Sequence, residues 1–343
     1  MRVTPTCDPL GSAFYVYYDG PLPVQYAPEI TFGGGNYFVV WSDNRSSNLQ
    51  IYGARVTPSG SVLDPSGILI TRNAAQYQYF PSVTWGGTRY FVVWGNYSPS
   101  PYYVYGRFVN TNGTMASDTI RLAAGSEAIY CADVAYDGTN FLVIWNEYGT
   151  TNALKGIRVS SAGAPIGSAF TIASPVYSFK SARVIFDGIN YLVTYSLSSG
   201  GVYQLWGRKY NTSGAPVGSA FRISPSTNNI YYADVVPGAN NRYLNVWSEY
   251  VSSQYDIRGN IDIEIVGVEE TEQEGISKVK IPSIIKKDIV LPEFSGKSIY
   301  LYDVSGRNIA HTDNGYFDFS KLHSGVYFIR LPEAGTYKII KIE

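Results

Sequence analysis

The chain has 343 residues and a formal net charge of −1, and 15% of its residues are aromatic, with 31 Tyr and 34 Gly. This charge balance leaves no field that would attract nucleic acid or an anionic membrane, and no run of eighteen or more apolar residues is present. Because aromatic and turn-forming residues favour strands over helices, the composition predicts an all-β protein of the extracellular type.

An aromatic pattern typical of a buried strand recurs along the chain at a constant spacing. Its five copies end at Trp41, Trp94, Trp145, Tyr195 and Trp247, at steps of 53, 51, 50 and 52 residues. A glycine in the expected third strand of each unit follows the same spacing, at Gly53, Gly106, Gly156, Gly207 and Gly259. A period near fifty that holds several short strands is typical of radial or stacked repeats. We expect each glycine to make room for the second-strand Trp.

The first repeat contains the elements expected in every unit. Residues 28–32 predict a first strand, 36–42 a second strand buried on both faces, 49–57 a third strand and 68–71 a fourth. Turn residues lie between the strands, as at Gly33–Gly35, where a positive φ is favourable. Each repeat is therefore expected to fold as one four-stranded antiparallel blade of a β-propeller.

The two ends of the repeat region predict how the ring closes. Pro9–Phe14 resembles the expected fourth strands Pro165–Phe170 and Pro216–Phe221, whereas the last repeat, residues 232–263, has three strands and no such segment. We therefore expect a five-bladed propeller in which the N-terminal strand completes the last blade. This closure would remove an exposed strand edge.

The first residues leave an alternative open. Met1–Pro5 resembles Ala54–Pro58, so the chain begins within a third strand, and no signal peptide precedes it. The alternative is a ring of six or seven blades whose first blades lie upstream of Met1.

The composition changes after residue 263. Residues 266–287 are rich in Glu and Lys, which is typical of a charged linker, and alternating strands around turns follow. We expect a propeller at residues 1–264, a linker at 265–287 and a small Ig-like β-sandwich at 288–343.

Three motifs of the last segment occur together: Tyr302–Arg307, Leu322–Ile329 and Lys338–Ile342. In this order they resemble the C-terminal sorting domain of proteins exported by the type IX secretion system of the Bacteroidetes and related phyla. The resemblance implies outer-membrane translocation, a final location outside the cell or on its surface, and the export machinery as a partner. The repeats resemble bacterial secreted propeller repeats more loosely, best at Tyr136–Trp145 and Gly156–Val159, and this likeness concerns the fold.

Few side chains suited to catalysis are present in the repeats. The only histidines are His311 and His323, both in the C-terminal segment, so catalysis or metal binding by histidine is not expected in the propeller. We expect no cofactor and no metal. Cys7 and Cys131 are expected at rim and channel positions, too far apart for an intrachain disulfide.

Charged residues recur near the start of four of the five innermost strands. The aligned positions are Glu29, Ser82, Asp133, Arg183 and Asp234. They place three acids and one arginine around one mouth of the axial channel, where two carboxylates could hydrolyse a glycoside. The alternative is that the acids cap loops and pair with Arg183.

Tyrosines recur two residues before the alignment points of the innermost strands. The aligned residues are Tyr26, Tyr79, Tyr130, Lys180 and Tyr231. Tyrosine suits sugar faces or a protein partner, although such rings could instead pack between blades. A second group, which includes Tyr148 and Tyr255, follows the second strands and is expected at the opposite end of the ring. Aromatic residues at both ends would favour stacking into a polymer.

Together these features predict a secreted or surface-bound protein without catalytic residues. Its expected ligand-binding residues are the tyrosine group with Lys180, together with the charged group at the mouth, and its expected partners are a glycan, a surface protein or further copies of itself. Nearly equivalent blades suit binding better than catalysis. The alternative is a carboxylate-dependent glycan-active enzyme, favoured by the differences of the fourth repeat at Lys180, Arg183 and Tyr195.

Overall fold

The computed structural model describes residues 2–3, 9–10, 12–18, 24–46, 48–71, 77–150, 152–176, 182–224, 226–238, 243–251, 254–262, 284–285, 288–291, 294–303, 308–323, 325–331 and 335–341. The chain divides into two compact units, residues 1–269 and 270–343. All the regular elements within the described ranges are β-strands. Across those same ranges, no helix has the length and apolar character needed to cross a membrane.

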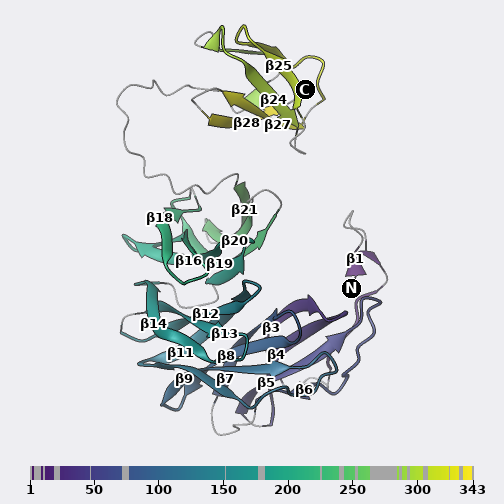
Figure 1. Ribbon diagram of the computed structural model, residues 1–343, viewed down its shortest axis with the longest axis vertical. Helices are drawn as coiled ribbons and strands as arrows, with labels where there is room; N and C mark the ends of the chain where they lie inside the picture. Colours follow the sequence, from purple (N-terminus) through teal and green to yellow (C-terminus); the bar gives the residue numbers. More distant parts are fainter. Residues whose placement is uncertain are drawn as a thin grey trace. The chain divides into compact units, whose positions relative to one another are not determined.

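The first unit is a β-propeller of antiparallel sheets that follow one another in chain order (Figure 1). The first sheet has strands β3 (Gln25–Gly33), β4 (Asn36–Ser46), β5 (Asn48–Val56) and β6 (Ile68–Leu69). The second has β7 (Tyr77–Trp85), β8 (Tyr90–Ser98), β9 (Tyr102–Val109) and β10 (Ile120–Gly125). The third has β11 (Ala128–Tyr136), β12 (Asn140–Tyr148), β13 (Ala153–Ser160) and β14 (Pro165–Ala173). The fourth has β15 (Arg183–Phe186), β16 (Tyr191–Ser199), β17 (Val202–Tyr210) and β18 (Pro216–Arg222). The last has β19 (Asn229–Pro237), β20 (Tyr243–Val251) and β21 (Gln254–Asp262).

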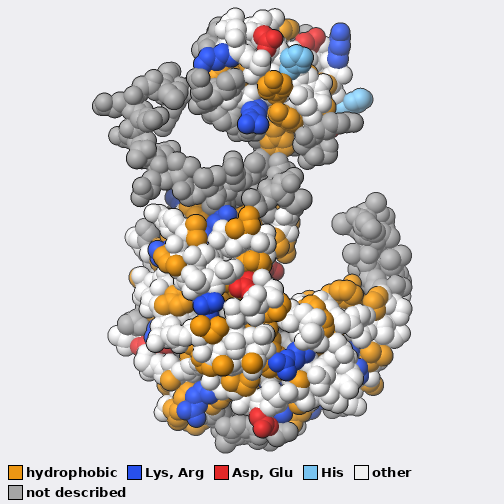
Figure 2. All heavy atoms as spheres, in the orientation of Figure 1, with side chains coloured by type: hydrophobic (Ala, Val, Ile, Leu, Met, Phe, Trp, Pro, Cys, Tyr) orange, Lys and Arg blue, Asp and Glu red, His pale blue; other side chains and the backbone are white. Residues whose placement is uncertain are grey.

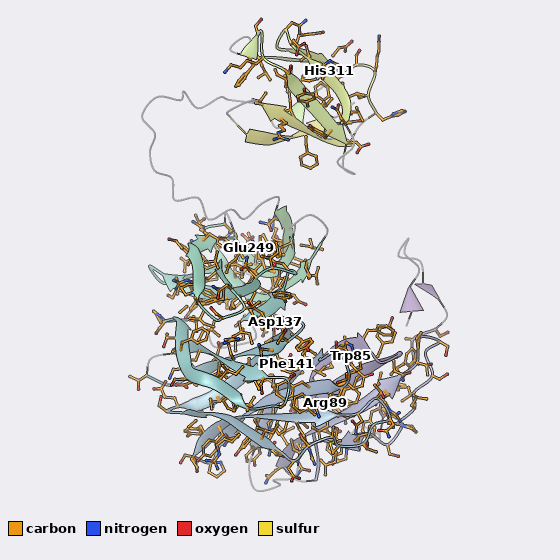
Figure 3. All side chains as sticks on the ribbon, viewed as in Figure 1. Trp85, Arg89, Asp137, Phe141, Glu249 and His311 are labelled. Atoms are coloured by element: carbon orange, nitrogen blue, oxygen red, sulfur yellow. The ribbon has the colours of Figure 1, made fainter. Side chains whose placement is uncertain are left out.

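Apolar side chains from adjacent sheets fill the space between them. Phe91 and Phe108 of the second sheet meet Phe141 of the third, with ring centroids 4.7 and 5.9 Å from that of Phe141. Figure 3 labels Phe141 together with Trp85 and Arg89 in this region. The second strands of the second, third and fourth sheets are buried on both faces, as the sequence pattern predicted, whereas those of the first and last sheets are each exposed on one face, at Tyr37 and Leu244.

Turns of one sheet also bind the second strand of the next. Tyr90 is fully buried, and its hydroxyl donates to the carbonyl oxygen of Gly33 at 2.6 Å. The Tyr243 hydroxyl likewise donates to the carboxylate of Asp187, which accepts two further bonds from backbone N–H groups of its own turn. These bonds fix the angle between neighbouring sheets.

The third-strand glycines make room for phenylalanine and not for the predicted tryptophan. A Cβ atom added to Gly53 or Gly106 would meet the ring of Phe38 or Phe91, on the second strand. A Cβ atom added to Gly156 or Gly207 would meet a fourth-strand phenylalanine. The prediction of close approach was correct, but the bulky neighbour was misassigned.

The predicted closing strand is not paired with the last sheet. Strand β2 (Pro9–Leu10) pairs with β1 (Arg2–Val3), and within the described ranges the last sheet consists of β19, β20 and β21. The residues that follow contact the first sheet instead: the ring of Tyr17 stacks on Trp41 at 5.8 Å, and the Arg45 guanidinium lies 3.7 Å from the Tyr17 ring centroid. These contacts hold the N-terminal segment on the first sheet.

The second unit contains two sheets around its own apolar core. Its five-stranded sheet has the order β22 (Ile284–Ile285), β28 (Gly335–Lys341), β27 (Gly325–Leu331), β24 (Ile299–Asp303), β25 (Asn308–Thr312). Strands β23 (Asp288–Val290) and β26 (Tyr316–Asp318) form the other sheet. Both histidines belong to this unit, and His311 is labelled in Figure 3. Most of the expected linker lies outside the described residues.

Candidate carboxylate site

A β-bulge interrupts the first strand of four sheets just before the charged positions. The pairing register shifts between Tyr26 and Glu29, and shifts recur at the equivalent places in β7, β11 and β19. At three of these bulges a residue with a side chain has a positive φ: Ala27 at 52°, Phe80 at 48° and Tyr232 at 44°. This conformation is costly for such residues, and bulges commonly redirect side chains beside functional sites. The bulge therefore sets the direction of the residues that follow it.

Arg183 joins the first strands of three sheets. Its Nη1 atom lies 2.9 Å from Oε1 of Glu29 on β3, and its Nε atom lies 3.4 Å from Oδ1 of Asp234 on β19. Because Glu29 belongs to the first sheet and Asp234 to the last, the two ends of the repeat region meet at this guanidinium. The first strands therefore line the axis of the propeller, as predicted from the repeat alignment.

Asp133 on β11 connects the second and fourth sheets at the same height along the propeller axis. Its Oδ1 atom accepts a hydrogen bond of 2.6 Å from the Ser82 hydroxyl on β7, and its Oδ2 atom accepts one of 2.8 Å from the backbone N–H of Val184 on β15. Asp133 is 8% exposed. The five aligned positions of the innermost strands thus form one connected cluster.

The electrostatics of the cluster distinguish its members. Burial raises the pKa of the Asp133 carboxyl, and the nearby charge of Arg183 and the hydrogen bonds from Ser82 and Val184 offset only part of this rise. Burial alone would lower the pKa of Arg183, but the negative charges of Asp133, Glu29 and Asp234 outweigh burial and raise it. Arg183 therefore stays protonated, while Asp133 holds its proton to a higher pH than an exposed aspartate.

The predicted tyrosines lie at the same end of the strands as this cluster, where many of them pack against other rings. The Phe80 ring lies 5.6 Å from Tyr79 and 6.0 Å from Tyr130 on the next sheet. Tyr231 contacts Tyr203 at 6.5 Å, whereas Tyr26 is 46% exposed. Lys180 lies outside the described residues. Packing between sheets thus explains why some of these tyrosines are present.

The expectation of a second tyrosine group at the opposite end was wrong. The Tyr148 ring lies 5.6 Å from Tyr130, and the Tyr255 ring lies 5.8 Å from Tyr231. In an antiparallel hairpin the end of the second strand lies beside the start of the first, so the two groups share one end of the propeller. This end is therefore richer in aromatic residues than predicted.

Buried acids that were not predicted from the sequence lie two residues after the repeat tryptophans. The Trp41 indole N–H donates to Asp43 at 3.0 Å, and the Trp145 indole N–H donates to Glu147 at 3.2 Å. Cations neutralise both acids, because Arg45 contacts Asp43 and Lys155 lies 2.9 Å from Glu147. The recurring Trp-x-acid spacing could have predicted these acids from the sequence. Since each acid is bonded within its own sheet, these groups stabilise the blades and are not candidate catalysts.

No group of three or more His, Cys, Asp or Glu suited to holding a metal ion occurs among the residues with described positions. Cys7 lies outside them, so the structure does not test the expectation about the two thiols.

Fold and site together define a β-propeller that gathers three carboxylates and one guanidinium at one end of its axis. No protein-family model matches the sequence, and no curated protein matches it either. Among solved structures, the chain is similar to an endo-arabinase from Bacteroides thetaiotaomicron, at 11% identity and a TM-score of 0.47, covering 71% of this chain and 95% of that one. A thermostable family-43 glycoside hydrolase is 10% identical, with a TM-score of 0.45 and coverage of 73% and 94%. An exo-1,5-alpha-L-arabinanase from a bovine ruminal metagenomic library is 9% identical, with a TM-score of 0.44 and coverage of 71% and 94%.

These comparisons contradict the expectation of a non-catalytic binding or assembly protein. The similar structures are arabinanases, arabinofuranosidases and other glycoside hydrolases, so the alternative of a carboxylate-dependent glycan-active enzyme agrees with them better. At such low identities and TM-scores the likeness concerns the fold, and the chemistry has to be argued from the site itself.

Proposed function

We propose that the chain is a glycan-active enzyme that uses the carboxylates at the end of its propeller axis. The observation that carries this proposal is the grouping of Glu29, Asp133 and Asp234 around Arg183. Glycoside hydrolysis needs two carboxyl groups roughly 5 to 9 Å apart, one protonated and one ionised. The charge of Arg183 acts on all three carboxylates, which supports their closeness, and the different burial of Asp133 and Asp234 suits two different roles.

The environments of two carboxyl groups suggest their roles. Asp133 has a raised pKa, which suits a proton donor to the leaving oxygen of the glycosidic bond. The Asp234 side chain is 66% exposed, which suits a carboxylate that activates water or attacks the sugar. Glu29 holds Arg183 in place and is a positioning residue.

The tyrosines at this end supply surfaces on which a sugar could lie. Tyr26, Tyr130 and Tyr231 each precede an acid of the cluster by three residues, and all belong to the same strand ends. An aromatic ring offers a flat apolar face and a hydroxyl, which together match the face and rim of a sugar ring.

Release of reducing sugar from a panel of soluble polysaccharides, arabinan and arabinoxylan among them, tests the proposal. We expect release from at least one polysaccharide, and Asp234→Asn should lower the rate by about 100-fold or more. Asp256→Asn is the matched control, because this exposed acid lies on β21 outside the cluster, and it should retain the parental rate. Failure to cleave any member of the panel would reject the proposal.

We propose further that the five sheets form one five-bladed ring and that residues 288–343 form an Ig-like sandwich that directs export by the type IX secretion system. The motifs Tyr302–Arg307, Leu322–Ile329 and Lys338–Ile342 support the export role. A reporter fused to residues 270–343 should reach the culture medium or the cell surface in a host with this system, and should stay inside a host strain that lacks it.

A further inference from the structure

The last repeat carries an asparagine where the other four repeats carry a valine. The residues two positions before the end of each second-strand pattern are Val39, Val92, Val143, Val193 and Asn245. The Asn245 side chain is fully buried, and its Nδ2 atom donates to Oδ1 of Asn260 on β21 at 3.2 Å. Its own Oδ1 atom has no hydrogen-bond partner among the described residues. Because a buried polar group without a partner is costly, a purely structural role would favour the valine of the other repeats.

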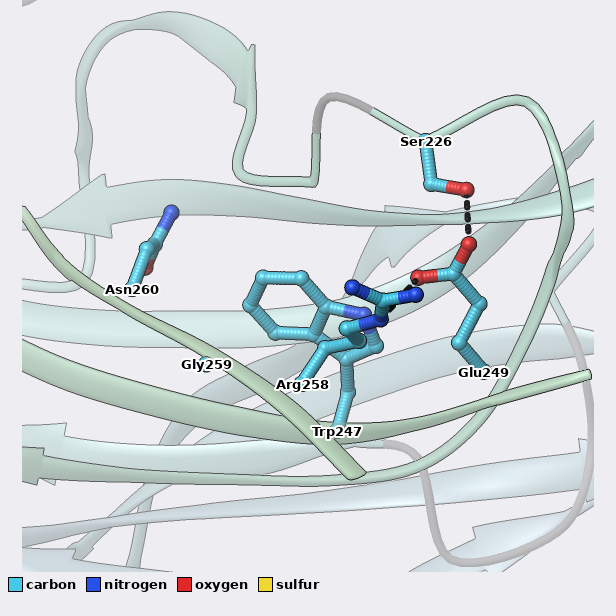
Figure 4. Close-up of a pocket in the computed structure, with 6 residues that line it drawn as sticks. All are labelled: Ser226, Trp247, Glu249, Arg258, Gly259 and Asn260. Carbon is cyan, nitrogen blue, oxygen red and sulfur yellow. Dashed lines mark hydrogen bonds and ion pairs between the residues drawn. The ribbon is translucent and has the colours of Figure 1, made fainter. Parts of the chain in front are cut away.

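Asn260 is partly exposed and lines a pocket of about 400 Å³ (Figure 4). The residues around this pocket are Ser226, Trp247, Glu249, Arg258, Gly259 and Asn260. Ser226 follows the outer strand of the fourth sheet and the others belong to β20 and β21, so the pocket lies between the fourth and last sheets. The Asn260 amide also donates to the carbonyl oxygen of Ile223 at 3.1 Å, which joins the two sheets beside the pocket. The volume is within the range of about 300 to 1,000 Å³ that holds small molecules.

The third sheet contains an equivalent arrangement in a closed form. Glu147 accepts hydrogen bonds from the Trp145 indole at 3.2 Å and from Ser126 at 3.0 Å. The Nζ atom of Lys155 lies 2.9 Å from the same carboxylate. Ile157, which is equivalent to Asn260, is buried in the apolar core beside Trp145. The acid of the third sheet is therefore engaged within the protein.

In the last sheet the equivalent acid keeps bonding capacity. Glu249 is buried, and its Oε1 atom accepts hydrogen bonds from Ser226 and Asn228. The Nε atom of Arg258 lies 3.7 Å from its Oε2 atom, which is beyond hydrogen-bond distance. The Arg258 side chain is 53% exposed, against 28% for the equivalent Lys155. A carboxylate oxygen and a guanidinium with five N–H donors thus lie beside each other at the pocket.

The pocket is separate from the axial carboxylates. Val246 lies opposite Asp234 on β19 and opposite Gly259 on β21, so two strand spacings, roughly 10 Å, separate Asp234 from the outer strand of the pocket. Trp247 and Arg258 form the next residue pair, whose side chains point to the other face of the sheet. A ligand held in this pocket would therefore not occupy the proposed catalytic site.

We propose that this pocket binds one sugar residue of a glycan, as a second site apart from the axis. A hydroxyl group both donates and accepts hydrogen bonds, so neighbouring sugar hydroxyls match the Oε2 atom of Glu249 and the guanidinium of Arg258 beside it. The second amide hydrogen of Asn260 is a further donor.

The charges around the pocket favour a neutral ligand. Arg258 balances the charge of Glu249, the acid that lines the pocket. On the face drawn in Figure 2, the charged side chains of the described residues of the first unit are scattered singly, without a patch of one sign that would attract a charged ligand. This inference does not depend on the proposed enzymatic activity.

Titration of the full-length protein with arabinose, xylose, galactose or glucose tests the site through its own tryptophan. The indole N–H signal of Trp247, assigned with Trp247→Phe, is followed in ¹H–¹⁵N spectra. We expect a saturable shift with at least one sugar and a Kd of roughly 1 to 10 mM, because a single sugar makes few contacts. The Trp145 signal is the internal control and should not shift. The absence of a saturable Trp247 shift at up to about 100 mM of every sugar, or an equal shift of Trp145, would overturn the proposal.

Single substitutions show whether the sugar is bound by the pocket or at the axis. Arg258→Met should weaken binding by at least about 10-fold, because a charged donor is lost. Arg121→Met makes the same change at an exposed arginine of β10 and should keep the parental Kd. Asp234→Asn should also keep it, so that failure of this proposal and failure of the enzymatic one can be told apart. Parental binding by Arg258→Met would contradict the assignment of the pocket.

A double variant, Asn245→Val with Asn260→Ile, tests whether the asparagines serve binding. It recreates the pair Val143–Ile157, which has the equivalent register in the third sheet. Because a buried amide without a full set of partners is replaced by apolar groups, the thermal midpoint should equal or exceed that of the parent, while sugar binding should be lost. A double variant with the parental Kd would overturn the proposal. A midpoint lower by more than about 5 °C would do so too, because it would assign the asparagines to the fold.

Discussion

Arg183 compensates three carboxylates at once, which makes it the side chain on which the cluster depends most. Removing its charge would leave Glu29, Asp133 and Asp234 close together without a cation. We expect Arg183→Met to lower the free energy of unfolding by about 3 kcal/mol, because an uncompensated buried charge is costly. Denaturant unfolding measures this change.

Arg258→Met serves as the control for that measurement. The Arg258 side chain is 53% exposed and contacts the exposed Asp256, and the buried Glu249 beside it keeps hydrogen bonds from Ser226 and Asn228, so the loss of Arg258 should cost less than about 1 kcal/mol. Equal losses of unfolding free energy in the two variants would mean that Arg183 stabilises the fold no more than a surface arginine does.

The protonation of Asp133 predicts how activity depends on pH. Its pKa in the folded protein is raised from 3.8, so the protonated donor persists above that pH and is lost as the pH rises through the raised pKa. We expect kcat/KM to fall on the alkaline side of the profile. A rate that rises steadily with pH over this range would assign the donor role to another group.

The repeat alignment predicted the positions of Glu29, Asp133 and Asp234 because equivalent residues of a propeller lie at one level. It did not predict the bulge that directs them. Ala27, Phe80 and Tyr232 have positive φ values, yet no glycine marks those places, so the local sequence carries no signal for this backbone.

At the scale of strands, the tyrosine at the start of a second strand ties one sheet to the turn of the preceding sheet. Tyr90→Phe removes the hydrogen bond to Gly33 and leaves a buried carbonyl without that donor. We expect a loss of about 1 to 2 kcal/mol in the free energy of unfolding. Tyr37→Phe is the matched control: Tyr37 is the same residue type at the equivalent position of the first sheet, where it is 38% exposed. It should be nearly neutral, and a larger loss in Tyr37→Phe than in Tyr90→Phe would contradict this account of the sheet contacts.

Strand order was more predictable than the contacts between strands. The apolar runs ending at Trp41 and its equivalents fixed the second strands, and the turn residues fixed their neighbours. Which ring lies against Gly53 or Gly156 depends on how two sheets meet, and that depends on the angle between them. The two tyrosine groups were assigned to opposite ends because the antiparallel pairing of β11 with β12, which puts Tyr148 opposite Ala128 and close to Tyr130, was not taken into account.

For the whole molecule, the period of the repeats predicted an all-β propeller with a separate C-terminal unit. Pro9 and Leu10 pair with β1 and not with the last sheet, and Tyr17 stacks on Trp41 of the first sheet, contacts that the repeat pattern does not encode. Function was harder to predict, since equivalent blades suggested binding, whereas the features on which the proposed catalysis rests are confined to the charge and burial of a few axial residues.

The central claim is that buried and exposed carboxylates at the axis cleave a glycosidic bond. The most direct measurement is the initial rate of reducing-sugar release by the parent and by Asp133→Asn, on whichever polysaccharide the parent cleaves, with folding verified by thermal unfolding. We predict a folded variant whose rate is lower by about 100-fold or more. A folded Asp133→Asn variant with the rate of the parent would contradict the account.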